Sequence, residues 1–159
     1  MTTEAGLAPI HLDFEVDCSQ RHAFAIWAER TSLWWPSSHT VTAEPGLEVV
    51  FEPHPGGRIF ERTRAGDEHD WGRIEAWDPP RRLAYTWHLN QDRADATDVE
   101  ITFTPLDGGR TRVDIDHRGW ERLGAAGPGL RARNTAGWAG VLPHYVVATA
   151  DPEVLATIR

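Results

Sequence analysis

The middle of the chain, residues 48–116, consists of short runs that suit β-strands and are separated by turn signals. The turns are marked by His54-Pro55-Gly56-Gly57, Ala65-Gly66-Asp67, Asp78-Pro79-Pro80, Gln91-Asp92-Arg93 and Asp107-Gly108-Gly109. Glycine, proline and aspartate favour chain reversal at such positions, and the spacing leaves little room for a long helix. We therefore predict a meander of antiparallel hairpins over this segment.

Apolar and polar side chains alternate within several of these runs. In residues 83–88, 99–104 and 113–116 every second side chain is large and apolar, which is the pattern of a strand with one buried face. Residues 9–17 show the same period and are predicted to form the first strand. Continued by one step, this parity places His117 on the apolar face of the last strand.

A short helix is predicted directly after the first strand. Ser19 provides an N-cap hydroxyl, and apolar residues follow at helical spacing up to about Glu29. The run Trp34-Trp35-Pro36 then loses this spacing, because proline disfavours helix at the residue before it. We expect an irregular loop there that carries two large indole rings.

A long helix is predicted to close the chain over residues 130–149, after a glycine, alanine and proline loop at 124–129. One stripe of this helix is expected to face the sheet. The stripe is formed by Asn134, Trp138, Leu142 and Tyr145. Pro143 is expected to kink the helix, because its ring clashes with the preceding turn and it provides no N–H group.

The order of strand, helix, several antiparallel strands and long helix predicts an α+β domain. A curved sheet with one apolar face must cover that face, and a long terminal helix laid across it can leave a cavity. A length of 159 residues suits one domain with its own core, and no repeat or linker divides the sequence. We expect a single domain over residues 1–159 with an apolar cavity between helix and sheet.

Composition argues against several classes of function. The formal net charge of −8 opposes binding to nucleic acid or anionic lipid. Cys18 is the only cysteine, the eight histidines never recur at the spacing of a zinc helix, and no glycine-rich phosphate loop occurs, so we predict no metal and no cofactor. The sequence has no signal-peptide pattern and no run of about 18 apolar residues, which predicts a cytoplasmic protein without membrane insertion.

Eight tryptophans against two tyrosines are the unusual feature of the composition. Large aromatic rings either fill a core or line an apolar pocket, and both interpretations stay open here. The residues expected to line the cavity are Tyr85, Trp87, Phe103, His117, Trp120, Trp138, Leu142 and Tyr145. A neutral His117 would orient a polar end of a ligand, whereas a core histidine with protein partners is the alternative.

Two motifs make the chain resemble a known superfamily. They are the run from Gly72 to Leu83 followed by Tyr85-Thr86-Trp87, and His117-Arg118-Gly119-Trp120 after the last predicted strand. In order and spacing they resemble the SRPBCC (START-like) superfamily, in its AHSA-type branch of heat-shock-protein ATPase activator homologues. The resemblance implies a helix-grip fold, in which a curved antiparallel sheet wraps around a long C-terminal helix with a hydrophobic cavity between them.

We expect non-enzymatic binding of a small apolar or aromatic molecule in the cavity, by a monomer or a homodimer. The second hypothesis is a cyclase-like or hydrolase-like enzyme with His117 as acid or base, which needs another titratable group in the pocket. The third is a co-chaperone-like interaction module with an exposed Trp34-Trp35 loop. Burial of these two rings would argue against the third hypothesis.

Overall fold

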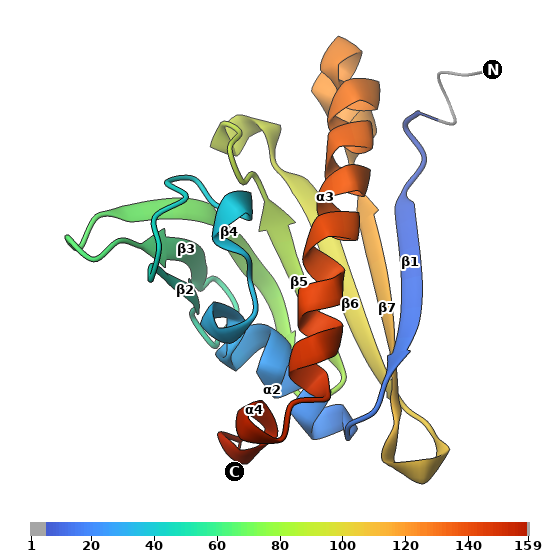
Figure 1. Ribbon diagram of the computed structural model, residues 1–159. Helices are drawn as coiled ribbons and strands as arrows, with labels where there is room; N and C mark the ends of the chain where they lie inside the picture. Colours follow the sequence, from blue (N-terminus) through green and yellow to red (C-terminus); the bar gives the residue numbers. More distant parts are fainter. Residues whose placement is uncertain (1–5, 159) are drawn as a thin grey trace.

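A seven-stranded antiparallel sheet curves around one long helix in the computed structural model, which describes residues 6–158 (Figure 1). The strands are β1 Ile10–Val16, β2 Glu48–Phe51, β3 Arg58–Arg62, β4 Glu68–Asp78, β5 Arg82–Trp87, β6 Thr97–Pro105 and β7 Thr111–Arg118. The helices are α2 Gln20–Glu29, α3 Gly127–Thr149 and α4 Pro152–Ala156. Short 3-10 helices lie at Thr31–Leu33, Ser37–His39, Arg93–Asp95, Asp107–Gly109 and Trp120–Ala126. The predicted α+β helix-grip fold is confirmed.

The N-terminal sequence used to predict the absence of a signal peptide lies partly outside the described residues. Within residues 6–158, no helix combines the length and the apolar character needed to cross a membrane.

The strands follow one another across the sheet, and β1 pairs with the last of them. The order is β1-β7-β6-β5-β4-β3-β2. Ile10 lies opposite His117, and Phe14 lies opposite Val113, so the apolar parity of β1 and β7 falls on one face. The hairpins predicted for residues 48–116 and the first strand predicted for residues 9–17 are therefore confirmed, with small shifts at their ends.

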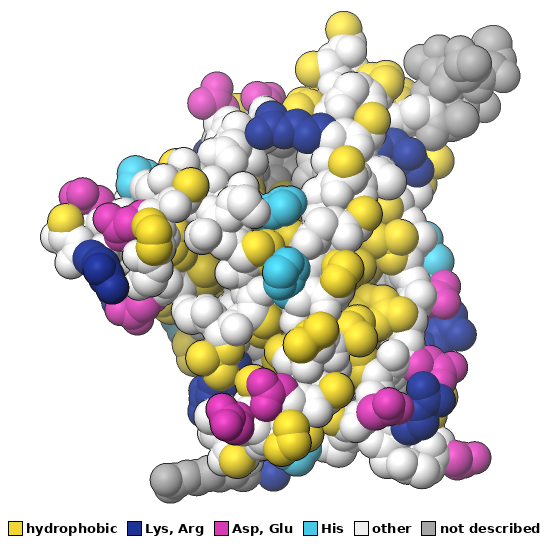
Figure 2. All heavy atoms as spheres, viewed as in Figure 1, with side chains coloured by type: hydrophobic (Ala, Val, Ile, Leu, Met, Phe, Trp, Pro, Cys, Tyr) yellow, Lys and Arg dark blue, Asp and Glu magenta, His cyan; other side chains and the backbone are white. Residues whose placement is uncertain are grey.

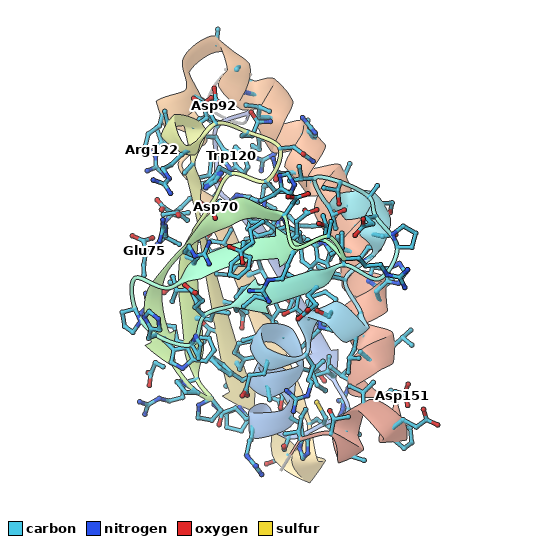
Figure 3. The ribbon with its side chains drawn as sticks, turned by 90° about the vertical axis from the view of Figure 1, so that its left-hand side faces the viewer. Asp70, Glu75, Asp92, Trp120, Arg122 and Asp151 are labelled. Atoms are coloured by element: carbon cyan, nitrogen blue, oxygen red, sulfur yellow. The ribbon has the colours of Figure 1, made fainter. Side chains whose placement is uncertain are left out.

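Two β-bulges interrupt β4 and change which of its side chains face the core. In the pairing of β4 with β3, Trp71 has no partner residue, and in the pairing of β4 with β5, Glu75 has none. Gly72 lies so close to β5 that a Cβ atom on it would be 1.9 Å from the Thr86 carbonyl oxygen. At the first bulge the Trp71 indole is fully buried, whereas Asp70 and Glu75 lie toward the outside of the strand (Figure 3).

Helix α2 begins where the sequence predicts it. The Ser19 hydroxyl accepts a hydrogen bond from the His22 backbone N–H at 3.2 Å, which satisfies one of the free donors of the first turn. The buried face of α2 carries Phe24, Ile26 and Trp27 into the space between the sheet and α3. This helix thus supplies the centre of the core.

Helix α3 starts at Gly127, earlier than the predicted residue 130. Pro128 fits the first turn, where a backbone N–H has no helical partner, and a Cβ atom at Gly127 would lie 2.4 Å from the Trp120 carbonyl oxygen. The helix is one element through Pro143. Its buried residues include Trp138, Val141, Tyr145 and Ala148. Leu142 is only half-buried, so the predicted stripe is corrected: steps of three and four residues carry it through Val141 instead.

Candidate functional site

An aromatic cluster fills most of the space between the helices and the concave face of the sheet. Its members are Trp27, Trp34, Trp35, Trp71, Tyr85, Trp87, Trp138 and Tyr145. The Trp27 ring centroid lies 5.1 Å from that of Trp34 and 4.9 Å from that of Tyr145. At these distances the rings pack as core side chains do. Tryptophan and tyrosine rings therefore fill most of the space in which an apolar cavity was predicted between helix and sheet.

A small hollow remains between α3 and the end of β5. Its volume is about 50 Å³, and its aromatic walls are Trp35, Trp87 and Trp138. The remaining lining residues are His39, Leu89, Asn134, Gly137 and Val141. Among the described residues, none of those that line the hollow is a carboxylate, lysine or arginine, so the hollow suits an uncharged ring.

The hollow opens into a wider surface depression of about 360 Å³. The two share His39, Trp87, Leu89, Asn134 and Gly137, and the depression adds polar groups from Ser38, Asn90, Gln91 and Arg133. Figure 2 shows this face of the molecule, with hydrophobic side chains along α3 and histidine side chains near its middle. A ligand that enters the hollow therefore keeps one edge among polar groups at the mouth.

A larger groove on the other side of residues 90–95 is a weaker candidate. It measures about 780 Å³ and is lined mainly by charged and polar side chains of β3, β4 and residues 90–95. Arg58 pairs with Glu68 at 3.1 Å, and Arg93 pairs with Asp70 at 3.4 Å. The lining also carries Asp92 and Asp95, so the groove is acidic and polar and lacks the apolar wall that a small-molecule site usually has.

The residues predicted to line a cavity fall into three groups. Trp87 and Trp138 line the hollow, and Trp120 lines a narrow space of about 10 Å³ that shares Trp87, Leu89 and Asn134 with it. In Figure 3, Trp120 lies toward the Asp92 end of the molecule, away from Asp151. Leu142 is a half-buried residue of α3 and lines neither space.

The third group is fully or almost fully buried behind the hollow: Tyr85, Phe103, His117 and Tyr145. Phe103 packs against Phe24, and the Tyr145 hydroxyl donates to the Ala23 carbonyl at 2.7 Å. Neither contacts the hollow in this structure. A role for this group in ligand binding stays a prediction.

Six residues of the hollow were not predicted to line a cavity: Trp35, His39, Leu89, Asn134, Gly137 and Val141. Asn134 carried a usable signal, since the sequence already placed it on the inner stripe of α3. Trp35 and His39 belong to an irregular segment, residues 34–40, whose sequence has no period that points a side chain inward. They reach the hollow only because this segment folds back over α3, where the His39 ring lies 2.9 Å from the position that a Cβ atom would take on Gly140.

His117 is held on both ring nitrogens. The Trp138 indole N–H donates to Nδ1 at 3.0 Å, and Nε2 lies 2.7 Å from the Thr97 hydroxyl. Because an indole only donates, Nδ1 carries no proton, so the Nε2–H group donates to Thr97, whose hydroxyl lies 3.3 Å from the Trp87 carbonyl oxygen. Both ring nitrogens of His117 thus have protein partners in this structure, and through Thr97 the ring links Trp138 on α3 to Trp87 on β5, two walls of the hollow. Its role in orienting a ligand stays a prediction.

Stability is expected to fall by about 2 kcal/mol between pH 7 and pH 5 because of His117. Burial lowers the pKa of His117 from 6.5 to about 3, so the unfolded chain takes up a proton below pH 6.5 while the folded protein stays neutral. The contribution is complete above pH 6.5 and is lost as pH falls toward 3. Urea denaturation at several pH values measures this slope.

The His117→Phe variant should lose this dependence between pH 7 and pH 5, because it has no imidazole to titrate. His144→Gln removes an exposed histidine of α3 and should keep the wild-type slope. Equal slopes in the wild type and His117→Phe would contradict the burial argument.

The Trp34-Trp35 segment is packed rather than exposed. Trp34 is buried, and its indole N–H donates to the Ile26 carbonyl at 2.8 Å. Trp35 is half-buried against Trp71 and Trp87 and donates to the His39 carbonyl at 2.9 Å. This observation goes against the interaction-module hypothesis, which depended on two exposed rings.

A buried carboxylate holds the far end of the same segment. Glu61 of β3 is fully buried and accepts four hydrogen bonds, two from the Val41 and Thr42 backbone N–H groups, one from the Thr42 hydroxyl and one from the Trp71 indole. Burial raises the pKa of Glu61, but these hydrogen bonds together outweigh burial and hold the pKa below its ordinary value. The loop that follows His39 is therefore fastened to the sheet by an ionised side chain.

One group of possible metal ligands occurs among the described residues. His11, Asp13 and Asp114 lie close together on the outer face of β1 and β7, away from the hollow, and the first two are exposed. Nothing in their surroundings distinguishes them from ordinary surface charges. The absence of a metal and of a cofactor stays a prediction.

A curved antiparallel sheet that grips a C-terminal helix, with an aromatic hollow at one end of the interface, defines a helix-grip protein of the START-like class. The chain belongs to the family of Activator of Hsp90 ATPase homolog 1-like proteins, whose model matches residues 17–145. The resemblance drawn from the sequence motifs is thereby confirmed.

Solved structures agree with this assignment. An anthrahydroquino-gamma-pyrone synthase is 35% identical, with a TM-score of 0.55 over 79% of this chain and 84% of that chain. The self-sacrificing resistance protein CalC from Micromonospora echinospora is 26% identical, with a TM-score of 0.69 over 91% of this chain and 95% of that chain. Protein NE0264 from Nitrosomonas europaea, at 14% identity and a TM-score of 0.65 over 98% and 97% of the two chains, shares the fold. No match was found among curated proteins.

Proposed function

We propose that the protein binds a small planar aromatic molecule in the hollow between α3 and β5. The observation that carries the proposal is the convergence of three indole rings around an uncharged space: Trp87 from β5, Trp138 from α3 and Trp35 from an irregular segment. Aromatic walls with a few polar groups at one edge are the usual make-up of a small-molecule site. The similarity to a synthase of an anthrahydroquinone-type product supports a polycyclic aromatic ligand.

The size of the hollow limits how such a ligand sits. A volume of about 50 Å³ takes only one edge of a fused ring system, whereas the adjoining depression of about 360 Å³ takes the remainder. The inner edge stacks against tryptophan, and the outer edge meets Asn134, whose amide already donates to the Leu130 carbonyl at 2.9 Å and keeps its oxygen for a hydroxyl donor. The ligand is therefore apolar inside and hydroxylated or otherwise polar outside.

Gly137→Leu is expected to lower the affinity for 1,8-dihydroxyanthraquinone by at least about tenfold, because the new side chain fills the mouth of the hollow. Gly137 lines the hollow, and nothing lies within 4 Å of the position that its Cβ atom would take. The fold should be retained or stabilised by up to about 1 kcal/mol, since glycine is a poor helix former. Quenching of tryptophan fluorescence measures the affinity.

Gly129→Leu is the matched control. Gly129 also lies on α3 with open space at its Cβ position, but it does not line the hollow. The control should bind the probe as the wild type does. Equal affinities in the wild type and Gly137→Leu would contradict the proposed site, and absence of wild-type binding to a set of planar aromatic probes would contradict the proposed function.

An enzyme of the cyclase kind is the second candidate, and the similarity to a synthase favours it. His117 is unsuited to be its acid or base, because both ring nitrogens have protein partners and burial lowers its pKa to about 3. His39 is the titratable residue that lines the hollow, and its Nδ1 lies 3.1 Å from the Ser38 hydroxyl. Binding alone leaves the mass of a bound aromatic or polyketide-like probe unchanged, whereas a protein-dependent change of mass would favour the enzyme.

A further inference from the structure

Two polar side-chain atoms in the described part of the chain are buried without a hydrogen-bond partner. They are the Trp27 indole nitrogen, on α2, and the Tyr85 hydroxyl, on β5. Both side chains are fully buried. Buried polar groups are almost always paired, and each unpaired one costs stability, so two of them together call for an explanation.

Five other buried aromatic donors have acceptors. The indole N–H groups of Trp34, Trp71, Trp120 and Trp138 and the hydroxyl of Tyr145 donate to the Ile26 carbonyl, Glu61, the His117 carbonyl, His117 Nδ1 and the Ala23 carbonyl, respectively. The unpaired condition of Trp27 and Tyr85 is therefore an exception within this cluster.

The two unpaired groups are near each other. Burial raises the pKa of the Tyr85 hydroxyl strongly, and the neighbouring Trp27 N–H lowers this pKa by a smaller amount. The two groups are close, but they do not satisfy the geometry of a hydrogen bond. The hydroxyl therefore stays protonated at any physiological pH. Two donors, one N–H and one O–H, are thus available in the same part of the interior.

This pair lies directly behind the walls of the hollow. The Tyr85 ring centroid is 5.6 Å from that of Trp87, and the Trp27 ring centroid is 6.1 Å from that of Trp138. Trp87 and Trp138 both line the hollow. One layer of aromatic rings separates the donors from the space in which the proposed ligand inserts its edge.

Of the three tryptophans that line the hollow, Trp35 is the one whose side chain can move most easily. It is half-buried, whereas Trp87 and Trp138 are buried, and its indole N–H donates to His39 within its own short segment. Trp35 and His39 can therefore shift together without losing that bond. His39 rests on α3 at Gly140, where the helix carries no side chain to hold it.

We propose that the Trp27 N–H and the Tyr85 O–H together bind one carbonyl oxygen at the inner edge of the ligand, so that the ligand class is a planar aromatic ketone or quinone. A carbonyl oxygen has two lone pairs and accepts from both donors at once. The ligand reaches them as Trp35 and His39 move outward. This inference rests on the proposed function and adds to it the chemical group that is recognised.

The test compares two probes that differ at the carbonyl groups, 1,8-dihydroxyanthraquinone and 1,8-dihydroxyanthracene, on the wild type and on Tyr85→Phe. The variant should bind the quinone about tenfold more weakly, because one hydrogen bond to the carbonyl is lost, and should bind the anthracene as the wild type does. Without ligand, Tyr85→Phe should unfold at the same temperature as the wild type or higher, because it removes an unpaired buried hydroxyl. Tyr145→Phe, which loses a made hydrogen bond, should unfold at a lower temperature.

Equal changes for both probes, or no change for the quinone, would overturn the inference while leaving the proposed function in place. A lower unfolding temperature of ligand-free Tyr85→Phe would also overturn it, because the hydroxyl would then already have a partner such as an internal water. If neither probe binds the wild type, the proposed function fails, and the inference fails with it.

Discussion

Glu61→Gln is expected to lower the free energy of unfolding by about 3 kcal/mol at pH 7. The glutamine NH₂ group is itself a donor, so buried N–H groups that now donate to the carboxylate lose their acceptor. One carboxylate oxygen of Glu61 accepts from the Val41 N–H at 2.6 Å and the Trp71 indole at 2.8 Å. The other accepts from the Thr42 N–H at 3.0 Å and the Thr42 hydroxyl at 2.8 Å. A glutamine amide turned one way places its NH₂ group against the Val41 N–H and the Trp71 indole, and turned the other way against the Thr42 N–H.

The loss should depend on pH in one direction. The pKa of Glu61 in the folded protein lies below its ordinary value of 4.5, so the unfolded chain binds the proton first as pH falls. The stabilisation is complete above pH 4.5 and is lost as pH falls through the folded pKa. The difference between the wild type and Glu61→Gln should therefore shrink below pH 4.5, which urea denaturation at neutral and acidic pH measures.

Glu68→Gln is the matched control on the neighbouring strand. Glu68 pairs with Arg58 and Arg62 at 3.1 and 3.0 Å, but at the surface. Ion pairs of this kind contribute about 0–1 kcal/mol, so the control should lose little. If the two variants lose the same amount, Glu61 does not act as a buried anchor for the loop that follows His39.

Trp138→Ala is expected to destabilise the protein by about 3–5 kcal/mol and to weaken binding of the aromatic probe as well. The ring is 5% exposed, packs against Trp27 and His117, and forms one wall of the hollow. Its removal leaves a cavity beside Trp27 and takes away the donor to His117. Urea denaturation and probe titration on the same protein measure the two effects separately.

Trp138→Phe separates the ring from its N–H group. It keeps an aromatic wall but leaves His117 Nδ1 without its donor, so we expect a loss of about 1–2 kcal/mol and a smaller change in probe affinity than with alanine. If alanine at this position changes neither stability nor affinity, the inner face of α3 has been assigned wrongly.

Much of the fold could be predicted because it depends on local sequence patterns. The period of two in residues 99–104 and 113–116, the Ser19 cap of α2 and the turn signals between strands each depend on a few neighbouring residues. The inner position of Trp138 followed from the helical period alone. The start of α3 was placed too late, because a proline and glycine run is typical of a loop unless a close contact, here with the Trp120 carbonyl, makes it the first turn of a helix.

The candidate site could be predicted only in part. Trp87 and Trp138 were identified, since strand parity and helix period point both inward. Trp35 and His39 were not, because their segment is irregular and its place over α3 depends on the contact at Gly140. Glu61 carries no signal of its role, because Ile59, Phe60 and Glu61 are all buried and the strand therefore shows no alternation.

By itself, the sequence determined the order of the elements, the apolar face of the sheet and the presence of an unusually aromatic interior. Only the tertiary structure decided what each polar group in that interior meets. His117 finds Thr97 and Trp138, about twenty residues away on either side, whereas Trp27 and Tyr85 find no acceptor. Periodicity sets which face a side chain takes, but the partner of a buried donor comes from a distant segment, and only the packing of α2, α3 and β5 brings those segments together.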